Sequence, residues 1–201
     1  MKRSKAFVFA VTLAALAGPL CAYADLAVDF TNPGQEWNNG NWSLGWKFSV
    51  NAPLTVEALG FYDDQKNGLT EAHDVGIFDS TGALIVSGRV QPNDPLESWW
   101  RWTGVTPTTL VVGEEYQIAA VTGTENYTWA PAGFVTDSQV NFLFDSYWTP
   151  ANGVLTYPNG SDGVTGYFGP NFSAQLVPLP GSLLLAIPAF ASVFGLRRRL
   201  S

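Results

Sequence analysis

The sequence predicts an all-β fold: a single antiparallel β-sandwich of jelly-roll-like type over residues 25–176, flanked by an N-terminal signal helix and a short hydrophobic C-terminal helix. Apolar residues in this central region recur with a period of two and show no sustained helical period. Clusters of Gly, Pro, Asn and Asp separate these runs about every ten residues, a spacing typical of sandwiches and barrels. The chain of 201 residues has one cysteine, Cys21, so the central domain must be held together by its core alone.

The first strands are expected in the N-terminal half of the domain. Residues 43–50 alternate between large apolar and small or polar side chains, and residues 75–77 and 84–90 continue this pattern on either side of the turn at 79–82. The side chains expected on the inner face are Leu44, Trp46, Phe48, Val50, Val75, Ile77, Leu84, Val86 and Val90.

Four further strands are expected in the C-terminal half. Their inward sets are Trp100 with Trp102; Tyr116, Ile118 and Ala120; Val140, Phe142 and Phe144; and Phe172, Ala174 and Leu176. The run Leu110 to Ile118 has the form L-x-x-G-x-x-Y-x-I, which is similar to the tyrosine corner of sandwich domains. We therefore expect Tyr116 to be largely buried, with its hydroxyl bonded to the backbone a few residues upstream.

Charge is distributed very unevenly along the chain. All 17 carboxylates lie between Asp25 and Leu176, together with only four basic residues, which gives this region a net charge of −13. A surface this acidic repels phosphate backbones, which excludes nucleic acid as a partner. It suits solubility outside the cell, weak cation binding or neutral partners such as glycans.

Residues 1–24 have the organisation of a signal peptide. Three basic residues precede an apolar stretch at 6–16, and Ala22-Tyr23-Ala24 forms an A-x-A cleavage site. We expect export through the Sec machinery and cleavage by signal peptidase before Asp25. Leu20 precedes Cys21 where a lipoprotein would have Gly or Ala, so lipidation is not expected.

The last 25 residues consist of three segments of different character. Val177-Pro178-Leu179-Pro180 is extended because proline disfavours helix, Leu183–Leu196 is apolar, and Arg197, Arg198 and Arg199 follow. A 14-residue helix is about 21 Å long, short of a hydrocarbon core of about 30 Å, which predicts a marginal, transient span of the inner membrane. The arginines should hold the C-terminus in the cytoplasm and leave the acidic domain in the periplasm. An ordinary permanent anchor is the alternative.

This tail resembles the PEP-CTERM sorting signal, with Leu179 in place of the usual Glu as in the V-P-L-P variant. The resemblance implies a Gram-negative exported protein that pauses in the inner membrane, is processed by an exosortase, and reaches the cell surface or the extracellular matrix of a bacterium that makes exopolysaccharide. A second resemblance is carried by residues 45–48, 56–62, 68–69, 73–78, Gly82 and 110–116. Through these residues the central domain is similar to an uncharacterised family of secreted β-sandwich domains, which implies no activity.

A polar cluster at residues 63–74 is a candidate cation site. Asp63, Asp64, Asn67 and Asp74 offer the oxygen ligands that Ca²⁺ prefers, although their spacing differs from that of an EF-hand. The alternative is a polar loop whose Asp and Asn residues stabilise their own turns. The only histidine, His73, lacks the partners of a zinc site or a nucleophile motif, and we expect it in a loop or at a strand edge. No cofactor is required by these patterns.

Abundant tryptophan makes a carbohydrate-binding platform the main alternative to a purely structural role. The candidates are Trp37, Trp42, Trp99, Trp100, Trp102, Trp129 and Trp148, most of which are expected in the core. Because neighbours on a strand point to opposite faces, Trp99 and Arg101 should lie opposite Trp100 and Trp102, and we select them as glycan-binding residues. The first hypothesis is a non-catalytic structural or interaction domain, the second a carbohydrate-binding module for exopolysaccharide, and the third a secreted glycan hydrolase, which would need paired carboxyls.

Overall fold

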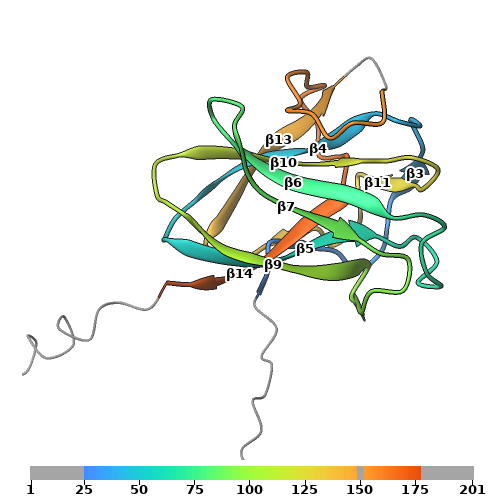
Figure 1. Ribbon diagram of the computed structural model, residues 1–201, viewed down its shortest axis with the longest axis horizontal. Coiled ribbons are helices and arrows are strands. Elements are labelled where there is room, and N and C mark those ends of the chain that lie inside the picture. Colours follow the sequence, from blue (N-terminus) through green and yellow to red (C-terminus); the bar gives the residue numbers. More distant parts are fainter. Residues whose placement is uncertain (1–24, 149–151, 178–201) are drawn as a thin grey trace, which may run out of the picture.

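The computed structural model describes residues 25–148 and 152–177, and these residues form strands and loops only (Figure 1). The predicted signal cleavage site at Ala22 and Ala24, the residues Pro178 to Pro180 and the arginines 197–199 lie outside the described residues. The described part of the chain has no helix that is long and apolar enough to cross a membrane.

Most strands belong to two five-stranded antiparallel sheets. The first has the order β1 (Asp25–Leu26), β14 (Pro170–Leu176), β5 (Leu54–Tyr62), β9 (Trp100–Leu110) and β8 (Leu96–Glu97). The second has the order β13 (Val140–Trp148), β4 (Ser43–Val50), β10 (Glu115–Val121), β6 (His73–Asp79) and β7 (Leu84–Val90). Two short ribbons complete the fold: β3 (Gln35–Trp37) with β11 (Tyr127–Trp129), and β2 (Val28–Asp29) with β12 (Val135–Thr136). The all-β, antiparallel prediction is confirmed.

Aromatic side chains from both sheets meet in one core. Trp46 of β4 stacks on Phe172 of β14 with ring centroids 5.8 Å apart, and its indole N–H donates to the Pro170 carbonyl at 3.0 Å. Phe48 lies 4.8 Å from the same Phe172 ring. Fully burying one such side chain contributes about 1.5–3 kcal/mol, and this apolar contact holds together a domain without disulfides.

Three predicted inward side chains lie outside the core: Leu176 is 56% exposed because it ends β14 at the rim of the sheet, and Leu84 and Phe144 point outward because of β-bulges. Leu84 is 48% exposed, since the β6–β7 register shifts between Ile77 and Phe78 and reverses the alternation beyond that point. A second shift at Phe142/Phe144 places Phe144 opposite Lys47, whose ammonium lies 5.3 Å from the Phe144 ring. All three predictions were wrong, and at Leu84 and Phe144 the reason is that a single inserted residue moves every later side chain to the other face.

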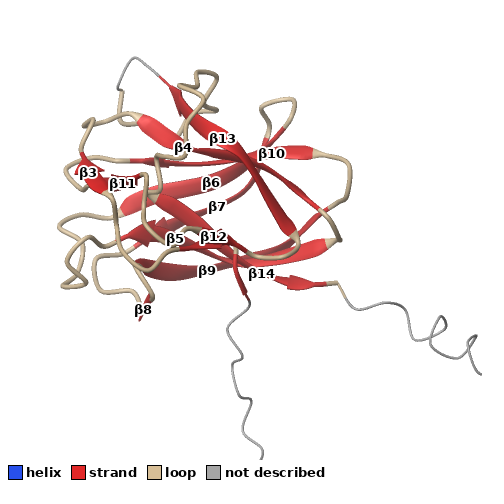
Figure 2. Cartoon of the chain, turned by 180° about the vertical axis from the view of Figure 1, so that it is seen from behind, coloured by secondary structure: helices blue, strands red, loops and turns tan. Residues whose placement is uncertain are grey.

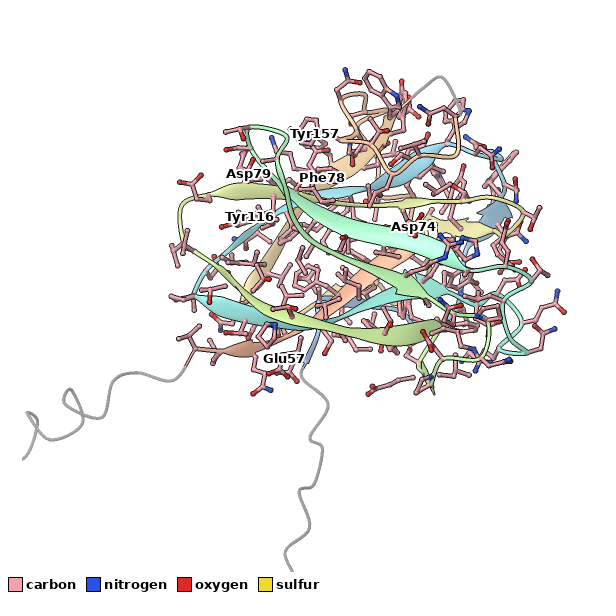
Figure 3. The ribbon with its side chains drawn as sticks, viewed as in Figure 1. Glu57, Asp74, Phe78, Asp79, Tyr116 and Tyr157 are labelled. Atoms are coloured by element: carbon pink, nitrogen blue, oxygen red, sulfur yellow. The ribbon has the colours of Figure 1, made fainter. Side chains whose placement is uncertain are left out.

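The tyrosine corner forms as predicted. Tyr116 at the start of β10 (Figure 3) is 5% exposed, and its hydroxyl accepts a hydrogen bond from the Val111 backbone N–H at 2.9 Å. Replacing Tyr116 by Phe leaves that N–H without its partner while keeping the ring. We expect a loss of about 1–3 kcal/mol in the free energy of unfolding, measured by urea denaturation. An unchanged midpoint would show that the bond contributes nothing.

Candidate functional site

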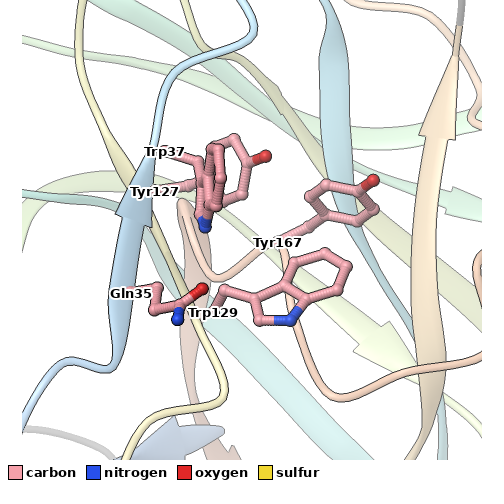
Figure 4. A pocket seen from close by; sticks show the side chains of 5 residues that line it. All are labelled: Gln35, Trp37, Tyr127, Trp129 and Tyr167. Atoms are coloured by element: carbon pink, nitrogen blue, oxygen red, sulfur yellow. The ribbon is translucent and has the colours of Figure 1, made fainter.

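One surface hollow of the domain is an aromatic cup of about 310 Å³ (Figure 4). Its lining, which we call the cup, consists of Gln35, Trp37, Tyr127, Trp129 and Tyr167. Four of these five residues are aromatic, and they come from the β3–β11 ribbon and from the loop that leads into β14.

The β3–β11 ribbon forms the cup because side chains alternate across its two short strands. Tyr127 pairs with Trp37, and Trp129 pairs with Gln35, so all four share one face of the ribbon. The middle pair, Glu36 and Thr128, occupies the other face. There Glu36 accepts a hydrogen bond from the Tyr62 hydroxyl at 2.6 Å, and the Thr128 hydroxyl accepts one from the Gly34 N–H at 2.9 Å. These bonds attach the ribbon to the domain.

The aromatic rings of the cup stand at steep angles to one another. Tyr167 lies 5.1 Å from Tyr127 at 60° and 4.9 Å from Trp129 at 80°. Tyr127 and Tyr167 are almost completely buried, whereas Trp37 is 53% exposed at the rim. The cup is therefore a hollow with inclined walls in which Trp37 is the most exposed ring, rather than a flat platform.

Hydrogen bonds fix the two tyrosines of the cup. The Tyr167 hydroxyl donates to Asp162 Oδ2 at 2.8 Å, and the Tyr127 hydroxyl donates to Asn39 Oδ1 at 3.3 Å. Burial, followed by the nearby Asp162 charge, raises the pKa of Tyr127 to about 12. Burial also raises the pKa of Tyr167 far above its usual value, with the hydrogen bond to Asp162 as the second cause. Both phenols are therefore neutral hydrogen-bond donors under physiological conditions.

A buried carboxylate holds the loop that carries Asp162. Asp145 on β13 has no exposed surface, and it accepts hydrogen bonds from the Ser161 hydroxyl at 3.1 Å, from the Asp162 N–H at 3.1 Å and from the Val164 N–H at 2.9 Å. Three donors satisfy its charge and fix the 161–164 loop against the strand. The position of Asp162 behind Tyr167 therefore depends on Asp145.

Trp99 and Arg101, the glycan-binding residues selected from the sequence, lie outside the cup and are engaged in other contacts. Trp99 stacks on Phe30 with centroids 5.7 Å apart, and its indole N–H donates to the Phe30 carbonyl at 2.9 Å. The Lys66 ammonium lies 3.6 Å from the centroid of the Trp99 ring. Arg101 pairs with Asp63. Trp100 and Trp102 are buried, as their alternation with Trp99 and Arg101 predicted.

The four residues of the predicted calcium site are each bonded to protein groups. Asp63 is buried and accepts from the Asn67 N–H at 3.2 Å, from the Gly68 N–H at 2.9 Å and from Arg101 Nε at 2.7 Å. Asp64 accepts from Asn126 at 2.9 Å, and Asp74 on β6 (Figure 3) pairs with Arg89 of β7 at 2.7 Å. Among the described residues, no three His, Cys, Asp or Glu side chains gather to hold a metal ion. The geometry is that of a loop in which Asp63 stabilises its own turn.

His73 opens β6 and is buried. Its ring stacks on Phe61 with centroids 3.8 Å apart, and Nδ1 lies 2.9 Å from the Val121 carbonyl, which makes Nδ1 the donor. Nε2 is buried without a hydrogen-bond partner in the described structure. Burial is the largest cause that lowers the pKa of His73. Its position as the first residue of β6 is close to the expected loop or strand-edge position, but the sequence gave no sign of its burial.

The lowered pKa of His73 predicts acid sensitivity. Below a pH of about 6.5 the unfolded chain binds a proton at His73 while the folded protein still excludes it. The contribution of neutral His73 to the free energy of unfolding is therefore fully present above that pH and is lost as the pH falls below it. We expect wild type to lose up to about 1.4 kcal/mol per pH unit there, and His73→Phe to remove that part of the slope. Urea denaturation at pH 7.5, 6.5 and 5.5 measures both. An identical slope in wild type and variant would contradict the assignment.

The cup lies far from the point where the described chain ends. In Figures 1 and 2, β3 and β11 occupy one end of the long axis, whereas β14 runs to the other end, where the description stops at Val177. The cup and the end of the described chain therefore lie at opposite ends of the domain.

Fold and site together define an all-β domain with a concave aromatic surface site. The chain belongs to the family described as Domain of unknown function (DUF4082), which matches residues 30–171 and so includes every residue of the cup. No curated protein matches the chain significantly.

Sequence reasoning identified part of this site. It named Trp37 and Trp129 among the candidate platform tryptophans but missed Gln35, Tyr127 and Tyr167. The period-two alternation of Tyr127 and Trp129 was a usable signal for a shared face. No local signal joins β3 to β11, because about 90 residues separate the paired strands, as in the pair Trp37 and Tyr127.

Proposed function

We propose that this chain is an exported cell-surface or extracellular-matrix protein whose central domain binds glycans without catalysis. Export rests on the signal-peptide pattern of residues 1–24, and sorting rests on the Val177–Pro180 motif with its apolar and arginine-rich continuation. In this proposal the Sec machinery, signal peptidase and an exosortase act on the two ends, with the inner membrane as a transient location.

We also infer that the two five-stranded sheets form a jelly-roll-like β-sandwich. The support is the shared core, in which Trp46 and Phe48 of the second sheet contact Phe172 of the first. A sandwich of this type places its loops at two ends. One end would face the membrane, and the other would present the cup.

The aromatic cup is the observation that carries glycan binding. Pyranose rings have apolar faces that pack on aromatic rings, and an exposed ring next to a pocket provides such a surface. Trp37 is the exposed ring, and the Gln35 amide is a donor and acceptor for hydroxyl groups. None of the five residues that line the cup is a carboxylate, whereas glycoside hydrolysis uses two at the scissile bond.

A glycan array and polysaccharide affinity electrophoresis of the full chain in mild detergent test this proposal. We expect retardation by at least one exopolysaccharide and no release of reducing ends. Trp99→Ala serves as a comparison, because it tests the site selected from the sequence. The absence of binding to any glycan would contradict the proposal, and hydrolysis at an enzymatic rate would favour the hydrolase alternative.

Mass spectrometry of the mature C-terminus tests the sorting part of the proposal separately. Processing by an exosortase predicts a mature chain that ends near Pro180, in membrane fractions or in the medium. An intact Ser201 would favour a permanent anchor.

A further inference from the structure

No positively charged side chain lines the cup. The described residues include four basic side chains, and each is engaged away from the cup. Lys47 pairs with Glu115, Arg89 with Asp74 and Arg101 with Asp63, while Lys66 covers the Trp99 ring. The potential at the cup is therefore set by carboxylates, within a region of net charge −13.

Two carboxylates stand behind the cup. Asp162 accepts the Tyr167 hydroxyl at 2.8 Å, and the buried Asp145 holds the Asp162 loop. The charges of both carboxylates help to raise the pKa of Tyr167, and the charge of Asp162 also helps to raise the pKa of Tyr127. A phenol that donates to a carboxylate gains electron density, which makes its ring face more attractive to a cation.

The ring arrangement favours a compact cation over a second flat ring. Tyr127 and Trp129 each pack edge-on against Tyr167, with centroids 5.1 and 4.9 Å apart, and these three rings line the hollow together with Trp37 and Gln35. Figure 4 shows the hydroxyls of both tyrosines directed away from Gln35 and Trp129, which leaves ring surface toward the hollow. Several aromatic faces around a small space are the usual surroundings of a bound ammonium group.

We propose that the cup selects glycans that carry a cationic ammonium group, such as polymers of amino sugars that lack N-acetyl groups. The ammonium group lies in the cup against the Trp129 ring, with the Tyr167–Asp162 pair behind it, and the sugar ring rests on the exposed Trp37. Uronic-acid polymers are rejected by the same carboxylates. This inference rests on the proposed glycan binding and adds to it the charge of the ligand.

Three glycan probes and one salt, measured at pH 7.5 with the full chain in detergent, separate this inference from the proposed function. The glycans are an N,N,N-trimethylated glucosamine hexamer, which is permanently cationic, the neutral N-acetylglucosamine hexamer and an anionic galacturonate hexamer. Tetramethylammonium chloride is the fourth probe. We expect the cationic hexamer to bind at least tenfold more tightly than the neutral one, the anionic hexamer to bind least, and tetramethylammonium to compete with the cationic hexamer.

Asp162→Asn is the informative variant, because an amide oxygen can still accept the Tyr167 hydroxyl while the charge is lost. We expect it to lower affinity for the cationic hexamer at least threefold and to leave the neutral hexamer unaffected. Glu57→Gln is the matched control: it removes one carboxylate on β5, away from the cup (Figure 3), and should change neither affinity.

The possible outcomes are distinguishable. Equal affinity for cationic and neutral hexamers, or preference for galacturonate, would overturn the charge selection and leave glycan binding intact. Tetramethylammonium binding that is weakened in Asp162→Asn, without binding of any hexamer, would support the cation site and contradict the proposed function. If no probe binds, both are contradicted.

Discussion

Replacing Asp63 by Ala should lower the free energy of unfolding by about 3–5 kcal/mol, the cost of removing one partner of a buried ion pair. The Asp63 side chain is 1% exposed and that of Arg101 is 15% exposed, with Oδ2 and Nε 2.7 Å apart. The variant leaves the Arg101 guanidinium without its anion, and it also removes the acceptor for the Asn67 and Gly68 N–H groups. Urea denaturation followed by tryptophan fluorescence measures the loss.

Asp74→Ala is the matched control for this prediction. Asp74 forms an ion pair of the same length with Arg89, but the two side chains are 43% and 57% exposed, so we expect a loss of at most about 1 kcal/mol. Equal losses in the two variants would refute the importance of burial. A melting temperature that rises with added Ca²⁺ in wild type, and in neither variant, would instead favour the calcium hypothesis for this loop.

Replacing Trp37 by Ala should weaken glycan binding by about 2 kcal/mol, roughly a 30-fold loss of affinity. Because this ring is 53% exposed at the rim of the cup, its removal should change stability by less than about 0.5 kcal/mol. Trp148→Ala provides the same chemical change on β13 outside the cup lining, and should leave affinity unchanged. Similar losses in both variants would contradict a role specific to the cup.

Ring position can be tested without removing an aromatic residue. A Cβ atom at Gly166 would overlap the Trp129 ring, so Gly166→Ala must displace that ring from its present contact with Tyr167. We expect at least a tenfold loss of glycan affinity. At Gly104 on β9 an added Cβ meets nothing within 4 Å, so Gly104→Ala is the silent control.

The fold was predictable because alternation is a local property of each strand. Trp46, Phe48, Val75 and Ile77 all lie in the core as their period-two spacing indicates. Leu84 was not predictable, because nothing in its own segment records the bulge in the β6–β7 register. The tyrosine corner was predictable because its hydrogen bond joins two groups only five residues apart.

The site was less predictable than the fold because its parts come from distant segments. Trp37 and Tyr127 become neighbours only through long-range pairing, and Tyr167 arrives from a third segment. The choice of Trp99 from the sequence followed its predicted face, but the sequence does not show that Phe30 and Lys66 contact that ring. Exposure, and not abundance, distinguishes a binding tryptophan from a core tryptophan.

The position of bound sugar tests the central claim, that the cup is the glycan-binding site, most directly. A crystal structure of the protein with the tightest-binding oligosaccharide should show a sugar ring against Trp37 and its substituent in the cup against Trp129. A sugar ring bound at Trp99, or anywhere else on the surface with the cup left free, would contradict the claim.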